Sequence, residues 1–218
     1  MRIVIAGGHG KIALLLESLL AERGDQAVGL VRNPAHVADV QKAGAEAVVC
    51  DLEAASAGDV AVLLAGADAV VFAAGAGAGS GAPRKDSVDR AAAVLMADAA
   101  ERAGVRRFVQ VSSMGAGQPP RPGSDEVWAA YITAKTAAED DLRSRDLDWI
   151  ILRPGGLTDT PPTGKIRLAA PPVPGGTVPR ADVAAVIAAL LDDPRTRQQT
   201  LELVGGDRPV AAAVRRIS

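Results

Sequence analysis

Short apolar runs recur along the chain and alternate with longer amphipathic stretches, a pattern that predicts β-strands separated by α-helices. Ile3, Val4 and Ile5 form the first run, and a continuous apolar run suits a strand that is buried on both faces. Further runs predict strands at residues 27–31, 47–50, 69–74, 108–111, 148–152 and 201–204.

Apolar residues with helical spacing occupy the stretches between these runs. Ile12, Leu16 and Leu20 recur on one face directly after the first strand, and Gly104 is a typical helix stop. Further helices are predicted at about residues 86–103, 126–145 and 181–191. Strands that alternate with helices imply right-handed βαβ units. The predicted fold class is therefore α/β, a doubly wound parallel sheet (Rossmann fold). Its 218 residues suit a single domain with a small C-terminal extension at the substrate rim.

A glycine-rich turn separates the first strand from the first helix. Gly7, Gly8 and Gly10 allow the backbone to approach a ligand closely, and the helix N-terminus beyond them favours an anion. The usual dinucleotide fingerprint is G-x-G-x-x-G/A, whereas this turn places His9 between its glycines and Ala13 at the third position. We interpret the turn as a phosphate site for a dinucleotide. The alternative is a strand-to-helix turn without a ligand.

Arg32 and Asn33 follow the second predicted strand, about twenty residues beyond the glycine turn. A carboxylate at this place would suit the ribose 2′-hydroxyl of NAD, whereas a guanidinium can bind a 2′-phosphate with paired N–H donors. We therefore expect NADP(H) as the preferred cofactor and keep NAD(H) as the alternative. A solvated arginine at a strand end would give the same pattern.

Acidic and small residues end the next two predicted strands. Asp51 and Leu52 follow the third strand, where they could meet the adenine edge of a dinucleotide. Asp51 could equally cap the next turn. Ala73, Ala74 and Gly75 end the fourth strand with the small residues that a chain passing close beneath a ribose requires.

A tyrosine and a lysine four residues apart suggest acid–base chemistry. Tyr131 and Lys135 lie on a predicted helix, so their side chains project from the same face. An ammonium group near a phenol favours the phenolate, so Tyr131 could exchange a proton with a substrate alcohol or carbonyl. Lys135 could also hold the nicotinamide ribose. Ser112 and Ser113, at the end of the fifth strand, could hydrogen-bond the same substrate oxygen.

Glycine- or proline-rich segments follow predicted strands at residues 75–83, 118–124 and 161–179. Ligands of open α/β sheets bind beyond the carboxyl ends of the strands, so these segments are candidates for a substrate rim or lid. They could equally be plain surface connections. Trp128, one turn before Tyr131, could wall the same pocket or belong to the core.

Composition and charge exclude several classes of partner. Twenty-four basic and twenty-six acidic residues give a net charge of −2, which offers no case for binding nucleic acid or an anionic membrane. No apolar run approaches the ~18 residues of a membrane span, and no signal peptide precedes the first strand. Cys50 is the only cysteine, which favours a reducing compartment, and we expect a cytoplasmic protein. Cys50, His9 and His36 lack the spacing of metal ligands.

Several segments together carry a family resemblance: Gly7–Ala13, Arg32, Asp51–Leu52, Phe72–Gly75, Val111–Ser113, Tyr131–Lys135, Leu152–Leu157 and Arg180–Ala184. In these segments the sequence resembles an atypical short-chain dehydrogenase/reductase of the NmrA-like type. Within that type it is similar to small bacterial NAD(P)-binding proteins related to flavin and biliverdin reductases. The resemblance covers nearly the whole chain.

The resemblance implies that Gly10, Lys11 and Ile12 line the cofactor diphosphate through their backbone groups. It also implies that a later segment lies near the nicotinamide, namely Pro154, Gly155, Gly156 and Leu157. The chain departs from the family pattern by a longer gap between Ser113 and Tyr131. It also lacks the larger C-terminal domain of the sugar-nucleotide epimerases, which argues against a nucleotide-sugar substrate.

These observations favour an NADPH-dependent oxidoreductase that reduces a small carbonyl, quinone or flavin-like molecule, with Tyr131 as acid, Lys135 in support and Ser113 orienting the substrate. One alternative is a non-enzymatic NADP(H)-binding redox sensor of the NmrA-like type. A weaker alternative is an epimerase or isomerase that retains its cofactor. The fold does not distinguish them. Oligomeric state stays open, because apolar helix faces in this fold pack inward or pair two copies in a homodimer.

Overall fold

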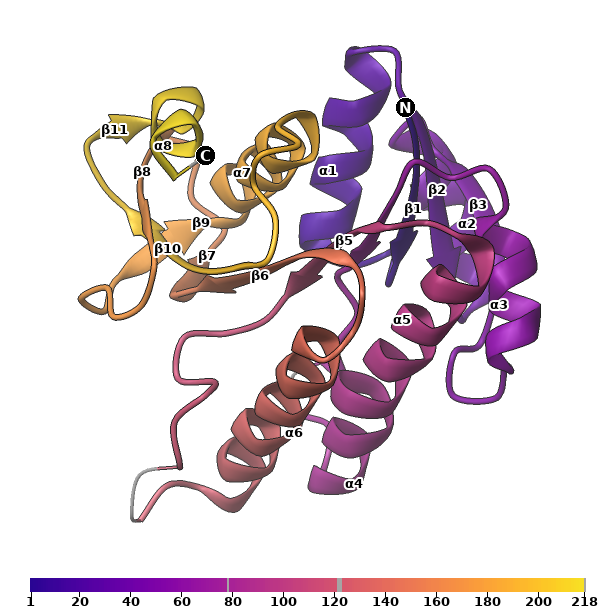
Figure 1. Ribbon diagram of the computed structural model, residues 1–218, viewed down its shortest axis with the longest axis horizontal. Helices are drawn as coiled ribbons and strands as arrows, with labels where there is room; N and C mark the ends of the chain where they lie inside the picture. The colour runs from indigo at the N-terminus through magenta and orange to yellow at the C-terminus, as the bar shows by residue number, and fades with distance from the viewer. Residues whose placement is uncertain (78, 121–122, 218) are drawn as a thin grey trace.

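The predicted alternation of strands and helices is confirmed in the computed structural model, which describes residues 1–77, 79–120 and 123–217 (Figure 1). The strands are β1 Arg2–Ala6, β2 Gln26–Val31, β3 Glu46–Val49, β4 Ala69–Phe72, β5 Arg107–Val111, β6 Asp148–Pro154, β7 Gly156–Thr158, β8 Lys165–Ala169, β9 Thr177–Pro179, β10 Gln199–Gly205 and β11 Arg208–Pro209. The helices are α1 Lys11–Glu22, the 3₁₀ turn η1 Pro34–His36, α2 Val37–Lys42, α3 Ala57–Leu64, α4 Ala82–Arg84, the π-helical η2 Lys85–Ala91, α5 Ala92–Ala103, α6 Glu126–Arg143, α7 Arg180–Asp192 and α8 Val210–Ile217.

Within the described residues the main sheet has the strand order β11-β8-β10-β6-β5-β4-β1-β2-β3. The strands from β3 to β10 in this order are parallel. The two strands at the other edge, β8 and β11, are antiparallel to their neighbours. The fold is therefore the predicted Rossmann-like α/β domain with an antiparallel edge.

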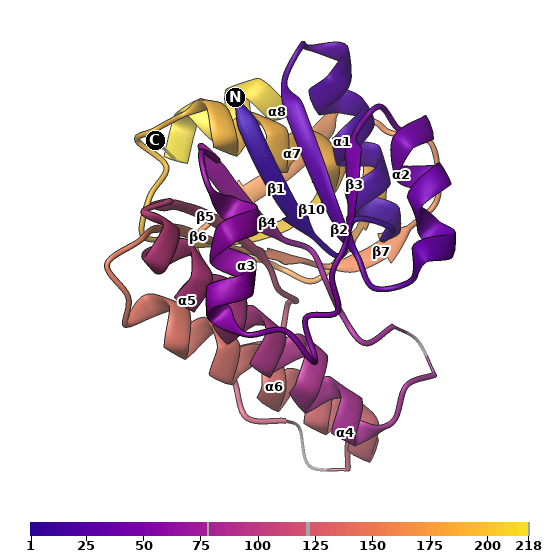
Figure 2. The same ribbon diagram turned by 90° about the vertical axis from the view of Figure 1, so that its right-hand side faces the viewer.

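Alternate residues of each central strand enter two separate hydrophobic layers. Ile3 and Ile5 of β1 pack in the layer that contains α1, α7 and α8, whereas Val4 and Ala6 pack in the layer that contains α5 and α6. Figures 1 and 2 show these helices on opposite faces of the sheet. Because both faces are covered, the central strands read as continuous apolar runs.

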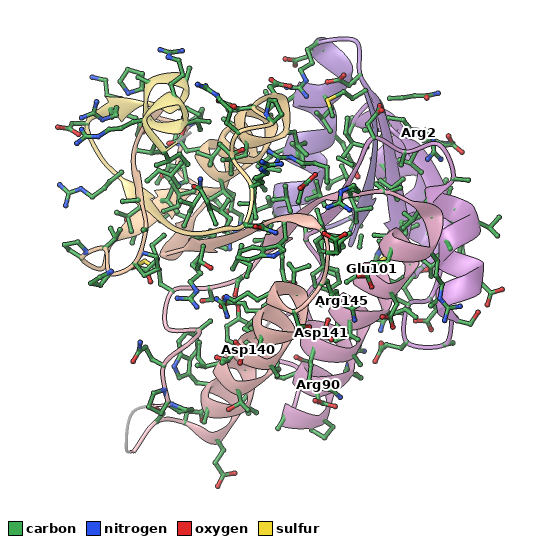
Figure 3. All side chains as sticks on the ribbon, viewed as in Figure 1. Arg2, Arg90, Glu101, Asp140, Asp141 and Arg145 are labelled. Atoms are coloured by element: carbon green, nitrogen blue, oxygen red, sulfur yellow. The ribbon has the colours of Figure 1, made fainter. Side chains whose placement is uncertain are left out.

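Charged residues at the ends of α5 and α6 join these two helices on the outer surface. Arg145 donates from Nη1 to Glu101 at 2.7 Å and to Asp98 at 2.6 Å, and from Nε to Asp141 at 2.7 Å. Figure 3 shows Arg145, Asp141 and Glu101 where the two helices run side by side. At its other end, α6 is capped by Asp125, whose side chain accepts a hydrogen bond from the Trp128 amide at 3.0 Å.

The expected loop at residues 161–179 is wrong in part, because residues 165–169 form β8 inside the main sheet. Ile166 and Leu168 are buried while Lys165 and Arg167 are exposed, which is the alternation of a strand with one solvated face. Residues 177–179 form β9, which pairs with β7. The expected loop at 75–83 ends earlier than expected, because α4 begins at Ala82, and residue 78 lies outside the described residues. Residues 121–122 of the third expected loop, 118–124, also lie outside them.

Candidate cofactor and active site

The predicted site residues gather at the carboxyl edge of the parallel sheet. Ala6 pairs with Phe72, Phe72 with Gln110 and Gln110 with Ile151, so the segments after β1, β4, β5 and β6 leave the sheet together. The strand order reverses between β1 and β4. The carboxyl edge at such a reversal is where open α/β sheets bind ligands.

The glycine turn packs closely against the neighbouring strands. Gly7 has a φ of +79°, and a Cβ at this position would lie 2.6 Å from the Cα of Ala74. A Cβ at Gly8 would lie 2.7 Å from the Cα of Gly29. Gly10 precedes α1 without any side-chain cap, so the first amides of α1 are left for another acceptor. This cradle fits a phosphate group.

Lys11 and Arg180 share one carboxylate in front of α1. Lys11 Nζ lies 2.6 Å from Asp159 Oδ2, and Arg180 Nη1 lies 2.6 Å from Asp159 Oδ1. The hydrogen bond from Lys11 lowers the pKa of Asp159, and Arg180 adds to this effect. Ile12 is half-buried and packs against the core. The sequence resemblance included Lys11 and Arg180, but Asp159 carried no signal.

His9 and His36 lie beside the glycine turn with their rings stacked. Their ring centroids are 3.6 Å apart and the ring planes differ by 8°. His9 Nε2 lies 2.8 Å from Asp39 Oδ2 of α2. Asn33 is a capping residue, since its side-chain oxygen accepts a hydrogen bond from the Ala35 amide at 3.0 Å.

Arg32 is half-exposed at the end of β2 and pairs with a carboxylate that the sequence analysis did not anticipate. Arg32 Nη1 lies 2.9 Å from Glu53 Oε2, which Arg84 Nη2 also approaches at 2.7 Å. Ser87 donates to the other carboxylate oxygen of Glu53 at 2.6 Å. The hydrogen bond from Ser87, followed by Arg84 and Arg32, lowers the pKa of Glu53. Both a guanidinium and a carboxylate therefore stand where a cofactor ribose is expected.

Asp51 makes the contact expected of a turn residue. Its Oδ1 accepts a hydrogen bond from the Glu53 amide at 3.1 Å, and Leu52 is half-buried against the core. After β4, the Ala73 amide still donates to Ala6 at 3.0 Å, although the strand ends at Phe72. A Cβ at Gly75 would lie 3.1 Å from Asp89 Oδ1.

Tyr131 and Lys135 are brought together on α6 as predicted. Lys135 is buried, and its Nζ lies 5.8 Å from the ring centroid of Tyr131. The same Nζ donates to the carbonyl oxygen of Val111 at 3.2 Å and lies 3.2 Å from Asp89 Oδ1. Trp128 stands 48% exposed with its ring centroid 5.4 Å from that of Tyr131. An exposed tryptophan beside the phenol suits the rim of a pocket better than the core.

The two serines after β5 have different partners. Ser112 is buried, and its hydroxyl donates to Glu139 Oε1 at 2.6 Å. Glu139 also accepts from Arg153 Nε at 2.9 Å, so Ser112 belongs to a buried polar network. Ser113 donates to the carbonyl oxygen of Met114 at 3.3 Å. No hydrogen bond joins Ser113 to Tyr131 in the described parts of the chain.

The segment Pro154–Leu157 lies next to Ser113. The Pro154 carbonyl accepts from the Met114 amide at 3.0 Å, and Gly156 donates to Gly176 at 2.9 Å. Leu157 is 39% exposed at the start of the short β7–β9 pair. This segment therefore borders the edge that carries Tyr131 and Lys135.

Two kinds of feature are missing from the residues that the structure describes. They contain no group of three or more His, Cys, Asp or Glu side chains able to hold a metal ion. None of their helices is both long enough and apolar enough to span a membrane.

A family model described as NAD(P)H-binding matches residues 7–194. The chain belongs to this NAD(P)H-binding family. It is 34% identical, over the full length of both chains, to a Bacillus subtilis protein named uncharacterized sugar epimerase YhfK. A putative NAD-dependent epimerase/dehydratase from Bacillus halodurans is 35% identical with a TM-score of 0.90, covering 99% of each chain. ChuY, described as an anaerobilin reductase from Escherichia coli O157:H7, is 30% identical with a TM-score of 0.78, covering 95% of this chain and 98% of its own. The family match therefore indicates that the cofactor is a nicotinamide dinucleotide.

Proposed function

We propose that this NAD(P)H-binding protein is an NADPH-dependent oxidoreductase that reduces a small carbonyl, quinone or flavin-like molecule. The observation that carries the proposal is the Tyr131–Lys135 pair, which stands at the same sheet edge as the glycine turn. The name of ChuY as a reductase supports the reaction class. The atypical short-chain, NmrA-like subtype is part of the same proposal.

The site residues divide into a binding group and a reacting group. Backbone amides of Gly10, Lys11 and Ile12 would hold the cofactor diphosphate at the uncapped start of α1. Bound NADPH supplies the hydride for the acceptor carbon or ring atom. Tyr131 donates its phenolic proton to the acceptor oxygen, and Lys135 favours the phenolate that remains. A proton from solvent then restores the phenol.

Ser113 orients the acceptor oxygen in this proposal, whereas Ser112 is held by Glu139. Among the described residues, the hydroxyl of Ser113 has only a 3.3 Å contact with the Met114 carbonyl, so a substrate oxygen would replace that partner at little cost. The exposed ring of Trp128 would border the acceptor.

The preference for NADP(H) rests on Arg32 and Arg84, two guanidinium groups that converge on Glu53. A 2′-phosphate brings at least as much negative charge as the Glu53 carboxylate, so it would compete for the same guanidinium groups. NAD(H) would instead offer its 2′-hydroxyl to Glu53. The predicted preference for NADP(H) requires that the 2′-phosphate displaces Glu53 from these guanidinium groups more favourably than the 2′-hydroxyl of NAD(H) binds to Glu53.

A second candidate function is epimerisation with a retained cofactor. The name of the Bacillus subtilis relative as a sugar epimerase favours it. In that reaction a cofactor retained at the glycine turn would supply reversible hydride transfer, so no net NADPH would be consumed. A third outcome, tight cofactor binding without any turnover, would favour a redox sensor.

The deciding experiment compares the wild-type protein with Tyr131→Phe, which keeps the ring and removes the hydroxyl. Calorimetric titration with NADPH and NADH measures cofactor preference, and NADPH oxidation is followed with carbonyl, quinone and flavin acceptors. We expect turnover to fall by about 100-fold or more in Tyr131→Phe while NADPH affinity stays within about 2-fold. Full turnover in this variant would remove Tyr131 as the acid. Equal affinity for NADH would refute the NADP(H) preference.

A further inference from the structure

Lys85 is a buried lysine that contacts the same phenol from another part of the chain. It is 8% exposed, and its Nζ lies 5.4 Å from the ring centroid of Tyr131. Lys135, the lysine of the sequence motif, has its Nζ at a similar distance of 5.8 Å from the same ring centroid. The ring of Tyr131 therefore has two ammonium groups near it, of which the sequence motif accounts for one.

The two ammonium groups differ in their charge balance. Lys135 lies 3.2 Å from the carboxylate of Asp89, which is 1% exposed. Lys85 donates instead to the neutral carbonyl of Gly77 at 2.9 Å, and none of the ion pairs in the described residues involves it. Because Asp89 offsets the charge of Lys135, Lys85 supplies the uncompensated positive charge beside Tyr131.

The backbone around Lys85 has the form needed to place both groups. Residues 85–91 form the π-helical η2, and Lys85, Val88 and Asp89 are all buried on its inner side. π-Helical turns are rare and occur frequently at functional sites. Arg84, directly before this turn, points instead to Glu53. The wider turn thus directs Lys85 and Asp89 together toward α6.

We propose that Lys85 is a positioning residue that acts through Tyr131, by stabilising the phenolate that forms when the proton leaves. The negative charge of Asp89 reduces the stabilisation that Lys135 gives to the phenolate. Asp89 also holds the Lys135 ammonium group between the Val111 carbonyl and the phenol. Among the described residues, the charged groups over the Tyr131 ring are Lys85 from η2 and Lys135 from α6 itself, and Asp89 from η2 lies 3.2 Å from Lys135. This inference rests on the proposed role of Tyr131 as the proton donor.

The chain offers a direct probe, because Tyr131 is its only tyrosine. The near-ultraviolet absorbance of phenolate, followed against pH, reports on this residue without substrate or cofactor. We expect Lys85→Met to move the midpoint of phenolate formation upward by about one pH unit. Asp89→Asn should move it downward, because the compensating charge is lost. Lys42→Met removes an exposed lysine of α2 and should leave the midpoint unchanged.

Further measurements separate charge from structure. Lys85→Arg keeps the charge and should keep the midpoint within about 0.3 pH units of wild type. Circular dichroism at each pH identifies the range in which the variants stay folded, and the alkaline limb of the pH–rate profile should shift in the same direction as the absorbance. If Lys85→Met does not fold, Lys85→Gln, which removes the charge but keeps a hydrogen-bond donor for the Gly77 carbonyl, should show the same upward shift, and an unchanged midpoint in it would overturn the inference.

An unchanged midpoint in Lys85→Met, or an upward shift in Asp89→Asn, would overturn the inference while leaving the oxidoreductase proposal intact. Conversely, full turnover in Tyr131→Phe would refute the proposed proton donor, whatever the absorbance titration of the Lys85 variants shows. The two failures are therefore distinguishable.

Discussion

Glu17 gives the sharpest test of the energetics of this fold. It lies on the inner face of α1, wholly buried, and neither carboxylate oxygen has a hydrogen-bond partner among the described residues. Its Oε1 sits against the glycine turn and β2, 3.1 Å from a Cβ placed at Gly8 and 2.5 Å from one at Gly29. Burial raises the pKa of Glu17 from its ordinary value of 4.5 to about 8. The perturbation we propose is Glu17→Gln.

The sign of the effect follows from proton counting. Between pH 4.5 and about 8 the folded protein keeps a proton on Glu17 that the unfolded chain releases. The free energy of unfolding therefore falls as pH rises through this window, by up to about 1.4 kcal/mol per pH unit. The full shift from 4.5 to about 8 corresponds to at most about 5 kcal/mol. A glutamine at position 17 has nothing to ionise, so it removes this loss.

The assay is urea unfolding of wild type and Glu17→Gln between pH 5 and pH 9, with Glu22→Gln, an exposed glutamate of the same helix, as the matched control. Other titrating groups are common to the proteins and cancel in the difference. We expect the variant to gain stability relative to wild type by up to about 4 kcal/mol as pH rises from 5 to 8.5. A difference that does not change with pH would refute the reasoning, as would the same gain in Glu22→Gln.

The remaining predictions concern stability at the sheet edge. Gly7→Ala should lose about 2 kcal/mol in urea unfolding and weaken NADPH binding, because its Cβ would meet the backbone of Ala74 in a left-handed conformation. Gly66 shares the positive φ, but a Cβ there would meet no atom within 4 Å. An equal loss of stability in Gly66→Ala would therefore show that backbone strain, and not the contact with Ala74, causes the loss. Glu139→Gln should lose about 3 kcal/mol by leaving the buried Arg153 with only the more distant carboxylate of Glu202, 3.9 Å away, among its charge partners in the described residues. A loss below about 1 kcal/mol would contradict the proposed buried network.

Most of the fold could be predicted because burial on both sheet faces leaves a simple mark on the sequence. In a run such as Ile3–Ile5, successive residues enter the hydrophobic layers on opposite faces of the sheet, so all of them are apolar. The central strands were therefore predicted close to their observed bounds. The helix stop at Gly104 was also predicted, and this residue has the expected φ of +72°. The strand β8 was missed because its alternating pattern covers only Ile166 and Leu168, inside a segment rich in proline.

The site was harder to predict, because its groups meet only in three dimensions. Tyr131 and Lys135 share one helix, so their spacing was enough to pair them. Lys85 and Asp89 come from the segment after β4, and no local pattern links them to α6. Glu53 was missed for the same reason, since it approaches Arg32 from the turn after β3.

The ion pairs at the sheet edge differ in burial, and this difference separates binding from chemistry. The Lys11–Asp159 and Arg32–Glu53 pairs are substantially exposed, and such pairs contribute little, so under the proposed function a cofactor phosphate would replace their carboxylates at small cost. The pair made by Lys135 is buried, so its exchange would leave an uncompensated charge in a poorly hydrated place. Under the proposed function, the exposed pairs would rearrange when the cofactor enters, while the buried Lys135 ammonium group would stay fixed beside the phenol. The proposed reduction would use this division, because its proton donor must stay in one place while a large charged cofactor binds and leaves.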